Sequence, residues 1–419
     1  MAASDHPTGY WPSPWPGEDG GPARRQVPLA GAPLDIQPGE SLETTFRLAP
    51  LSVMPVIRDP GEVFLLTCSL PGDDTTMTLE RIDPESLGPV ATTGPVPTGP
   101  FWPGGVAAHA DGSLVVVQGN RIHTVTEDCT VERTTELPQS RPYNSFVCFD
   151  DGSVVTKDFG IDTDEPCEIL VLDPATHEFR ATPVHLPEPS IGRITADGDT
   201  LYVTGVTTSY RLHWDAASGE LRLDDDWQHR YVREGGSYGW DPCLAGGSMW
   251  VMDGGAESRS FSGTFRGAGT AEAPSRVIRV DIDDPTDHEA FEISGLPNGF
   301  QCNVMVYSEA HDTAVAFDAG NAVVAAWQPG PDGPTLRWQS ELGHAAHLLL
   351  WEETGELVLG DHDPERGDDV VIVDVVTGEE RARAATGSPM QTALFPCPGW
   401  GRDFYHTTMA GIWRAAVTS

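Results

Sequence analysis

Residues 141–187 read RPYNSFVCFDDGSVVTKDFGIDTDEPCEILVLDPATHEFRATPVHLP, and this stretch contains four short apolar runs separated by turn signals. The first two runs, 145–149 and 154–157, flank an Asp-Gly pair. Asp-Gly between β-branched runs predicts a tight hairpin whose two turn positions both have positive φ. Two further runs flank a second turn that starts at Asp173. The stretch therefore predicts four consecutive antiparallel strands.

Turns of the second kind recur along the chain at a nearly constant spacing. They start at positions 83, 127, 173, 215, 283, 329 and 374, so successive turns are 44, 46, 42, 68, 46 and 45 residues apart. A repeat of about 40–50 residues that holds four strands is the signature of a propeller blade. The predicted units are 52–98, 99–137, 138–187, 188–231, 232–297, 298–342, 343–387 and an eighth that begins at Ser388 and ends after three strands.

With these turns and this period, residues 41–419 resemble the β-propeller superfamily, in general character the quinoprotein-like, YVTN and regucalcin-like propellers. The resemblance implies an all-β fold in one ring, with eight four-stranded blades as our prediction and seven as the alternative. The run Leu42–Leu48 is predicted to complete the last blade, because a ring closed in this way leaves no exposed edge. Residues 1–40, rich in Pro and Gly, form either a flexible tail or an arm that docks through its tryptophans.

The charge of the chain excludes several classes of partner. It has 25 Lys and Arg against 63 Asp and Glu, a formal net charge of −38. Phosphate backbones and anionic lipid surfaces would repel it, so we expect neither nucleic-acid nor membrane partners. The seven cysteines form no CxxC pair, the N-terminus has no basic and apolar signal region, and no apolar run is long enough for a membrane span. These features favour a cytoplasmic protein.

Propeller geometry predicts where functional side chains gather. If strands A to D of each blade run from the axis to the rim, the A–B and C–D turns lie on one face. The B–C loops and the connections between blades lie on the other face, so the starts of the A strands and the ends of the B strands converge on one mouth of the channel. A small-molecule ligand is expected there, and the candidate binding residues are Trp102, Tyr143, Asn144, Lys157, Arg193, Trp240, Asn303 and Gln391.

The same mouth collects groups suited to acid–base chemistry. The catalytic candidates are His347, His362, His406, Asp361, Asp241 and Asp253. The three histidines are also the candidate ligands of a divalent cation, since neutral imidazole is a common transition-metal ligand. A second cation site would use the oxygens of Asn144, Asp241 and Asn303, which is similar to the channel site of regucalcin-type propellers and suits Ca²⁺ or Mg²⁺. The alternative is that these are structural histidines and polar residues of a water-filled channel.

Two local features add to this mouth. The irregular spacing of 68 places an insertion at 254–275, between strands B and C of the fifth unit. Its Gly- and Ser-rich ends suit a lid that would bring Phe261, Phe265, Arg259 and Arg266 near a pocket, and a surface insertion is the alternative. Lys157 is the only lysine of the chain. It is a substrate anchor or the partner of a neighbouring aspartate, and the alternative is a desolvated nucleophile or base.

The sequence therefore predicts an enzyme that acts on a small organic molecule at the channel mouth by His/Asp acid–base or metal-assisted chemistry, of the hydrolase, lyase or isomerase type. The alternative is a non-catalytic propeller that binds a protein or peptide on the same face, because the propeller fold does not fix function. A closed pocket would favour the enzyme, whereas a broad, flat aromatic face would favour the scaffold.

Overall fold

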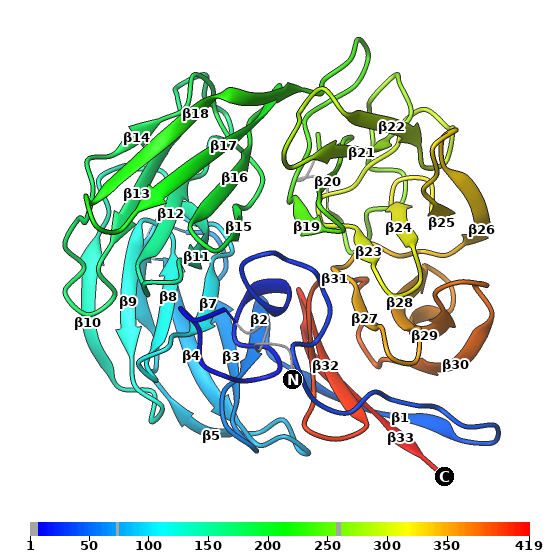
Figure 1. Ribbon diagram of the computed structural model, residues 1–419. Coiled ribbons are helices and arrows are strands. Elements are labelled where there is room, and N and C mark those ends of the chain that lie inside the picture. Colours follow the sequence, from blue (N-terminus) through cyan, green and yellow to red (C-terminus); the bar gives the residue numbers. More distant parts are fainter. Residues whose placement is uncertain (1–6, 73–74, 257–260) are drawn as a thin grey trace, which may run out of the picture.

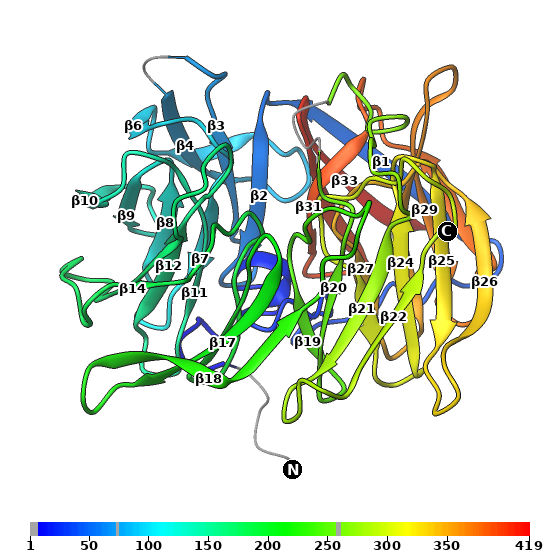
Figure 2. The same cartoon turned by 90° about the horizontal axis from the view of Figure 1, so that it is seen from above.

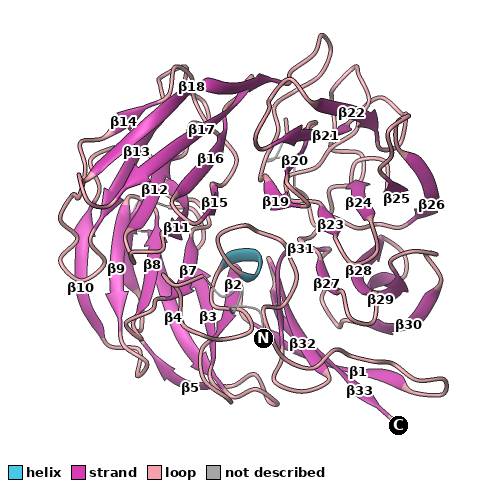
Figure 3. Ribbon diagram, viewed as in Figure 1, coloured by secondary structure: helices cyan, strands magenta, loops and turns pink. Residues whose placement is uncertain are grey.

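The strands form eight antiparallel sheets that surround one axis (Figures 1 and 3). The computed structural model of the chain describes residues 7–72, 75–256 and 261–419. The protein is an eight-bladed β-propeller, so the predicted number of blades is confirmed. Within the described ranges, no helix has the length and apolar character needed to cross a membrane.

The first four blades follow the chain from the axis to the rim. Blade 1 consists of β2 (Ser52–Ile57), β3 (Val63–Cys68), β4 (Thr75–Ile82) and β5 (Pro89–Thr92), with β6 (Val96–Gly99) also paired to β4. Blade 2 consists of β7 (Gly105–Ala108), β8 (Leu114–Gln118), β9 (Arg121–Val125) and β10 (Val131–Glu136). Blade 3 consists of β11 (Tyr143–Cys148), β12 (Val154–Asp158), β13 (Glu168–Leu172) and β14 (Val184–His185). Blade 4 consists of β15 (Thr195–Asp197), β16 (Thr200–Thr204), β17 (Thr208–Asp215) and β18 (Glu220–Arg230).

The next three blades repeat this order, and the last blade combines both ends of the chain. Blade 5 consists of β19 (Cys243–Ala245), β20 (Ser248–Met252), β21 (Arg276–Asp281) and β22 (His288–Glu292). Blade 6 consists of β23 (Val306–Ser308), β24 (Thr313–Asp318), β25 (Val323–Gln328) and β26 (Thr335–Glu341). Blade 7 consists of β27 (Leu349–Trp351), β28 (Glu356–Asp363), β29 (Gly367–Asp374) and β30 (Glu380–Ala385). Blade 8 consists of β31 (Thr392–Pro398), β32 (Asp403–Thr408), β33 (Gly411–Thr418) and β1 (Ser41–Leu48).

Ring closure follows the prediction. Strand β1 pairs antiparallel with β33 along its whole length, from Ser41 opposite Thr418 to Leu48 opposite Gly411. The early strand thus becomes the rim strand of the last blade (Figure 1). Because the two strands lie at opposite ends of the sequence, their pairing ties the first blade to the last and removes a free sheet edge.

The Asp-Gly hairpins differ in detail from the predicted two-residue turn. Of the pair in blade 3 only Gly152 has a positive φ, 82°, and its N–H donates to Phe149 O at 2.9 Å. The turn is therefore centred on the two residues before the glycine, which is the three-residue hairpin form. The Asp151 carboxylate accepts the N–H of Ser153 at 2.8 Å and so stabilises this form. Gly112 has the same place in blade 2, with a φ of 91°.

Residues 7–40 form an arm that packs on the A–B turn face and enters the central channel. Figure 2 shows this N-terminal segment reaching the ring from one face, with its helical turn η1 (Glu18–Gly20) between the inner strands. Trp11 N–H donates to Ala108 O of β7 at 2.9 Å, and Pro22 O accepts the N–H of Ala196 in β15 at 2.8 Å. Of the two alternatives from the sequence, the docked arm describes residues 7–40.

The arm satisfies backbone groups of the inner strands that have no partner in their own sheets. Besides β7 and β15, it is hydrogen-bonded to further innermost segments of the ring at Ile57, Cys148, Leu244, Met305 and Leu350. An unpaired buried N–H or C=O costs free energy comparable to a lost hydrogen bond, so these contacts stabilise the centre of the ring.

Replacing Trp15 with alanine tests how much the arm contributes to stability. Trp15 is 1% exposed and packs with Leu34, Ile57 and Leu349. We expect the Trp15→Ala variant to lose about 3–5 kcal/mol of unfolding free energy, because a buried Trp-to-Ala change leaves a cavity. Urea denaturation followed by circular dichroism measures the loss.

The matched control is Leu29→Ala, since Leu29 also belongs to the arm but is 36% exposed. Its unfolding free energy should change by no more than about 0.5 kcal/mol. Equal losses in the two variants would contradict the proposed packing of Trp15.

Candidate functional site

A cavity of about 700 Å³ opens at the end of the channel opposite the arm, and we call it the mouth cavity. Its wall is mainly aromatic and aliphatic, and only a few polar side chains reach it. Concave, mostly apolar cavities with few convergent polar groups are typical ligand sites. The lining residues are Leu51, Pro71, Phe101, Trp102, Pro103, Pro142, Ile161, Arg193, Trp240, Phe261, Phe265, Cys302, Asn303, His347, Ala393, Leu394, Phe395 and Met409.

Strand order explains why these residues meet. Trp102, Trp240 and Asn303 each lie three residues before an innermost strand, at the starts of β7, β19 and β23. Arg193 and His347 lie two residues before β15 and β27. Segments far apart in the sequence therefore contribute equivalent positions to one opening. These five predicted residues line the mouth cavity.

The fifth-blade insertion supplies part of the cavity wall. Phe261 and Phe265 line it, and the Phe265 ring lies 4.8 Å from that of Phe300. Gln391, a predicted binding residue, holds this segment in place. Its side-chain oxygen accepts the backbone N–H of Phe265 at 2.7 Å, and its backbone N–H donates to Gly263 O at 2.9 Å.

Of the two arginines of the insertion, Arg266 is described by the structure and does not line the cavity. Arg266 pairs instead with Glu341 at 2.9 Å, an ion pair between partly exposed side chains. Arg259, the other arginine named from the sequence, lies outside the described residues.

The floor of the mouth cavity is a buried ion cluster to which the arm contributes three residues, Glu18, Asp19 and Arg24. Arg24 is fully buried; it pairs with Glu18 and donates to Asp19 Oδ2 at 2.9 Å. Arg193 Nη1 donates to Glu18 Oε1 at 2.6 Å. Asp241 Oδ1 accepts the backbone N–H of Arg193 at 2.7 Å. The cluster joins the arm to the blades that bear the predicted site.

His347 links this cluster to the cavity. Its Nδ1 lies 2.8 Å from Asp19 Oδ1, and its Nε2 lies 4.0 Å from Asp241 Oδ2. The ring stacks on Phe395 with 3.9 Å between ring centroids. Although burial acts to raise the pKa of Asp19, the nearby His347 and Arg24 lower it below its usual value. A lowered pKa keeps Asp19 as a carboxylate at neutral pH.

The carboxylates near His347 lie beside cations. Glu18, Asp19 and Asp241 are negatively charged, and Arg24 and Arg193 form ion pairs with them. Because the arginine donors are used by carboxylates and carbonyls, the floor has little to offer a highly charged anion.

Three of the predicted binding residues lie buried behind the wall instead of lining it. Lys157 is fully buried and its ammonium donates to Asn144 Oδ1, Asp158 O and Ser190 O, at 3.1–3.3 Å. Asn144 also donates to Ile191 O at 3.0 Å. The Tyr143 hydroxyl donates to Glu168 at 3.4 Å. Since their polar atoms are occupied by the protein, these three side chains support the blade.

The predicted carboxylates other than Asp241 form ion pairs away from the cavity. Asp253 pairs with Arg276 at 2.7 Å, and Asp361 pairs with Arg383 at 2.7 Å. Both arginines lie on the neighbouring C or D strand of the same blade. The sequence placed these aspartates correctly at the ends of B strands, but strand partners neutralise them.

Among the described residues, the predicted histidines His362 and His406 do not form a metal site with His347. The ring nitrogen of His362 lies 3.6 Å from Asp368, and His406 stacks on Trp413 with ring centroids 5.3 Å apart. In the part of the chain that the structure describes, no three His, Cys, Asp or Glu side chains are grouped so that they could hold a metal ion. In the second predicted set, two oxygens are engaged by the protein: Asn144 Oδ1 accepts from the Lys157 ammonium at 3.3 Å, and Asp241 Oδ1 accepts the Arg193 N–H at 2.7 Å.

Burial also removes His344 and His406 from proton transfer near neutral pH. Desolvation lowers the pKa of each imidazole from its ordinary value to about 3. Both rings therefore remain neutral in the native state. Cys302 lines the cavity, but burial raises the pKa of its thiol, so it stays protonated. His347 is the described group best placed for acid–base chemistry.

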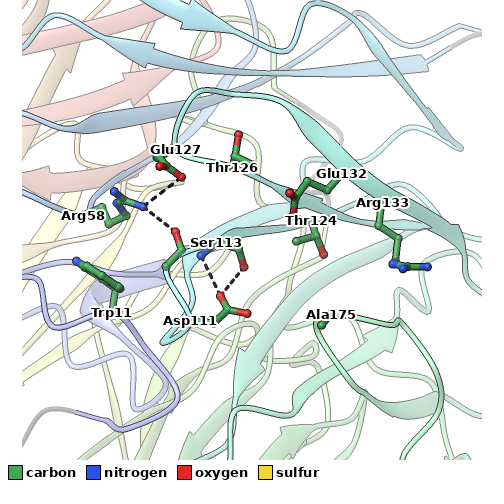
Figure 4. Close-up of a pocket in the computed structure, with 11 residues that line it drawn as sticks. Trp11, Arg58, Asp111, Ser113, Thr124, Thr126, Glu127, Glu132, Arg133 and Ala175 are labelled. Atoms are coloured by element: carbon green, nitrogen blue, oxygen red, sulfur yellow. Dashed lines mark hydrogen bonds and ion pairs between the residues drawn. The ribbon is translucent and has the colours of Figure 1, made fainter.

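A second cavity, of about 760 Å³, lies on the opposite face between the turns of blades 1 to 3 (Figure 4). Two of its charged side chains, Arg58 and Asp111, are engaged in holding those turns. Arg58 donates to Gly112 O at 2.7 Å and to Glu62 at 2.8 Å, and Asp111 accepts from Ser113. No buried polar group among the described residues of this wall is left for a ligand, so the mouth cavity is the candidate site.

Sequence reasoning missed the contribution of the arm. Glu18 and Asp19 lie in a segment whose composition, rich in Pro and Gly, is that of a tail, and they have no strand pattern around them. The only signal was the set of aromatic residues at 10, 11 and 15, which indicated docking but not the position of the carboxylates.

The comparisons with known proteins establish the fold and nothing finer. No protein-family model matches the sequence, and no curated protein matches it. The quinohemoprotein alcohol dehydrogenase from Comamonas testosteroni has 12% identity and a TM-score of 0.66, over 99% of this chain and 81% of that one. The quinohemoprotein alcohol dehydrogenase ADHIIG from Pseudomonas putida HK5 has 9% identity and a TM-score of 0.65, over 97% and 80%. A europium-containing methanol dehydrogenase has 10% identity and a TM-score of 0.60, over 94% and 89%.

The neutral state of His406 predicts a dependence of stability on pH. Because its pKa is lowered from 6.5 to about 3 on folding, its contribution is complete above pH 6.5 and is lost as the pH falls toward 3. At pH 5 the loss is about 2 kcal/mol, since each unit corresponds to about 1.4 kcal/mol. In a His406→Asn variant, the decrease in unfolding free energy between pH 7 and pH 5 should be smaller than in the wild type by about this amount.

Urea denaturation at the two pH values measures this difference. The control is His185→Asn, because the His185 side chain is 55% exposed on a rim strand. An unchanged pH dependence in the His406 variant would show that folding does not lower the pKa of the His406 ring.

Proposed function

We propose that the mouth cavity binds a small, mostly apolar organic molecule and that His347 exchanges a proton with it. The observation that carries this proposal is the position of His347: it is the described imidazole that lines the cavity and that also contacts a buried carboxylate. A reaction of the hydrolase, lyase or isomerase type would use such a group as general base and acid.

The wall favours a planar, weakly polar molecule. Trp102 and Trp240 are nearly parallel, with ring centroids 6.4 Å apart and an interplanar angle of 16°. Phe261, Phe265 and Phe395 extend this aromatic surface. Aromatic walls bind flat apolar molecules through area burial and offset stacking. Asn303 and His347 are the polar groups that could recognise one hydroxyl or carbonyl of the ligand.

The engagement of the arginines argues against phosphorylated or multiply charged substrates. Arg193 already contacts Glu18 and the carbonyls of Pro103 and Gly104. Binding a second anion would require these contacts to break in a buried site, where an unpaired carboxylate is costly. We therefore infer a neutral substrate that carries a weakly acidic proton.

The alternative function is the binding of a protein or peptide by the same face. The cavity is concave and its aromatic residues converge inward, which suits a small ligand better than a flat partner. A pull-down partner that protects the mouth from chemical modification, without any small molecule being bound, would favour this alternative.

Binding can be tested with 2-naphthol, a neutral planar molecule with a weakly acidic hydroxyl, and with 2-naphthoate as its anionic counterpart. We expect 2-naphthol to bind more tightly and the Trp240→Ala variant to bind it at least about tenfold more weakly, a loss of about 1.4 kcal/mol or more. Titration calorimetry measures both affinities.

Trp400→Ala is the control, because Trp400 lies in the turn between β31 and β32, outside the mouth cavity. Its affinity for 2-naphthol should equal that of the wild type. Tighter binding of 2-naphthoate than of 2-naphthol would exclude the neutral substrate class.

Catalysis can be tested by converting neutral aromatic alcohols, esters and ketones that bind, with product detection by mass spectrometry. We expect His347→Gln to reduce turnover by about 10²–10⁴-fold, the usual contribution of a general acid or base, while binding persists. His362→Gln should retain turnover, since His362 lies beside Asp368. Full activity of the His347 variant would refute its role.

A further inference from the structure

His347 has two ring nitrogens, and only one of them faces the arm. Nδ1 lies 2.8 Å from Asp19 Oδ1, an ion-pair contact whose angle is outside that of a hydrogen bond, whereas Nε2 lies 4.0 Å from the nearest carboxylate oxygen of Asp241. The nitrogen that carries the proton in neutral imidazole is set by the partner of the ring. The arm therefore decides which nitrogen of His347 is available as a base.

We propose that Asp19 is a positioning residue of the site: its carboxylate holds the proton of His347 on Nδ1, so that Nε2 presents its lone pair to a molecule in the mouth cavity. This inference rests on the proposed function of His347 and deepens it. In the reaction, the substrate O–H or C–H bond breaks, its proton passes to Nε2, and the imidazolium later returns that proton to the product.

No other carboxylate of the described chain can take this role. Asp241 lies 4.0 Å from Nε2, which is longer than a hydrogen bond, and its other oxygen is held by the backbone N–H of Arg193. Arg193 lies over the Phe395 ring, the ring that also stacks on His347. His344 and His406, the remaining titratable neighbours, are neutral imidazoles.

Asp19 is itself held firmly in its position. Its side chain is completely buried, Arg24 donates to its second oxygen at 2.9 Å, and its carbonyl accepts the N–H of Gln26 at 3.0 Å. Its backbone adopts a left-handed conformation, with φ at 52° and ψ at 29°, which Asp tolerates better than most residues. A carboxylate fixed on both sides suits the orientation of a neighbouring ring.

The charge of Asp19 has a second consequence. A carboxylate within hydrogen-bonding distance of an imidazole stabilises the imidazolium that forms when Nε2 accepts a proton. Against the effect of burial, His347 and Arg24 lower the pKa of Asp19, and Glu18 in turn neutralises Arg24 and contacts Arg193. The arm thus brings the carboxylate together with the cation that keeps it charged.

Gly105 gives the arm the room that this arrangement needs. A β-carbon at this position would lie 2.0 Å from Glu18 Oε1. The start of β7 must therefore be free of a side chain for Glu18 to reach the floor. The missing side chain at Gly105 therefore leaves space for Glu18, the residue that directly precedes Asp19 in the arm.

The test uses nitrogen NMR of the full-length protein labelled with ¹⁵N-histidine, at a pH where the ring of His347 is neutral. A His347→Gln spectrum assigns the two nitrogen signals of His347 among the 13 histidines by their disappearance. We expect Nδ1 to bear the proton in the wild type. A proton on Nε2 would overturn the inference without any variant at position 19.

The Asp19→Asn variant then tests the charge. The amide has nearly the size and shape of the carboxylate, but the negative charge is gone. We expect the pH midpoint for reaction of His347 with diethyl pyrocarbonate to fall by about one to three units, the usual effect of removing an opposite charge at this distance. An unchanged midpoint in a folded Asp19→Asn protein would also overturn the inference.

Glu40→Gln is the matched control, because Glu40 is another carboxylate of the arm and pairs with Arg402 at the surface. Its ¹⁵N spectrum and reaction midpoint should equal those of the wild type. If the control shifts as much as the Asp19 variant, the effect reflects docking of the arm in general, and the specific role of Asp19 is refuted.

These results are separable from the proposed function. If His347→Gln keeps full turnover while the wild-type ring carries its proton on Nδ1, the catalytic proposal fails and the contact with Asp19 stands as structure. If His347→Gln abolishes turnover but Asp19→Asn leaves both turnover and the reaction midpoint unchanged, the base is confirmed and the positioning role is lost.

Discussion

The centre of an eight-bladed ring imposes a constraint on the whole molecule, because each innermost strand has one edge without a partner in its sheet. If only water bound to these edges, the centre of the ring would be an open, hydrated channel. Here residues 7–40 hydrogen-bond to those edges and bring Glu18, Asp19 and Arg24 to the axis. The result is a channel that is closed on one face and open as a cavity on the other.

This closure sets the chemical character of the candidate site. A carboxylate and a guanidinium buried together are tolerated only when they neutralise each other and their hydrogen bonds are satisfied. The arm meets the charge condition with residues of its own and with Arg193 of blade 4. His347 lies at the boundary between this ion cluster and an aromatic wall. The same cluster that stabilises the centre of the ring also contacts His347, the residue proposed to exchange a proton.

The fold could be predicted from the sequence because the same turn is repeated in successive blades. Asp173 and its equivalents in other blades accept N–H groups two and three residues ahead, and this local chemistry is repeated wherever the C–D turn is needed. The period of these turns therefore predicted eight blades, and the apolar run 42–48 predicted the closing strand. The alternation of faces also placed Trp102, Arg193, Trp240, Asn303 and His347 at the mouth, since equivalent positions in successive blades must converge there.

The sequence by itself determined the number of blades, their closure and the end of the channel at which polar and aromatic residues gather, because each of these depends on local turns and a regular repeat. Only the tertiary structure decided which of those residues are available. Partners on other strands or loops already bind the side chains of Asp253, Asp361 and Lys157. Asp19 contacts His347 although more than 300 residues separate the two in the sequence. The physical reason is that a side chain's chemistry depends on its nearest partners, and the pairings of an irregular arm or of neighbouring strands have no periodic signal.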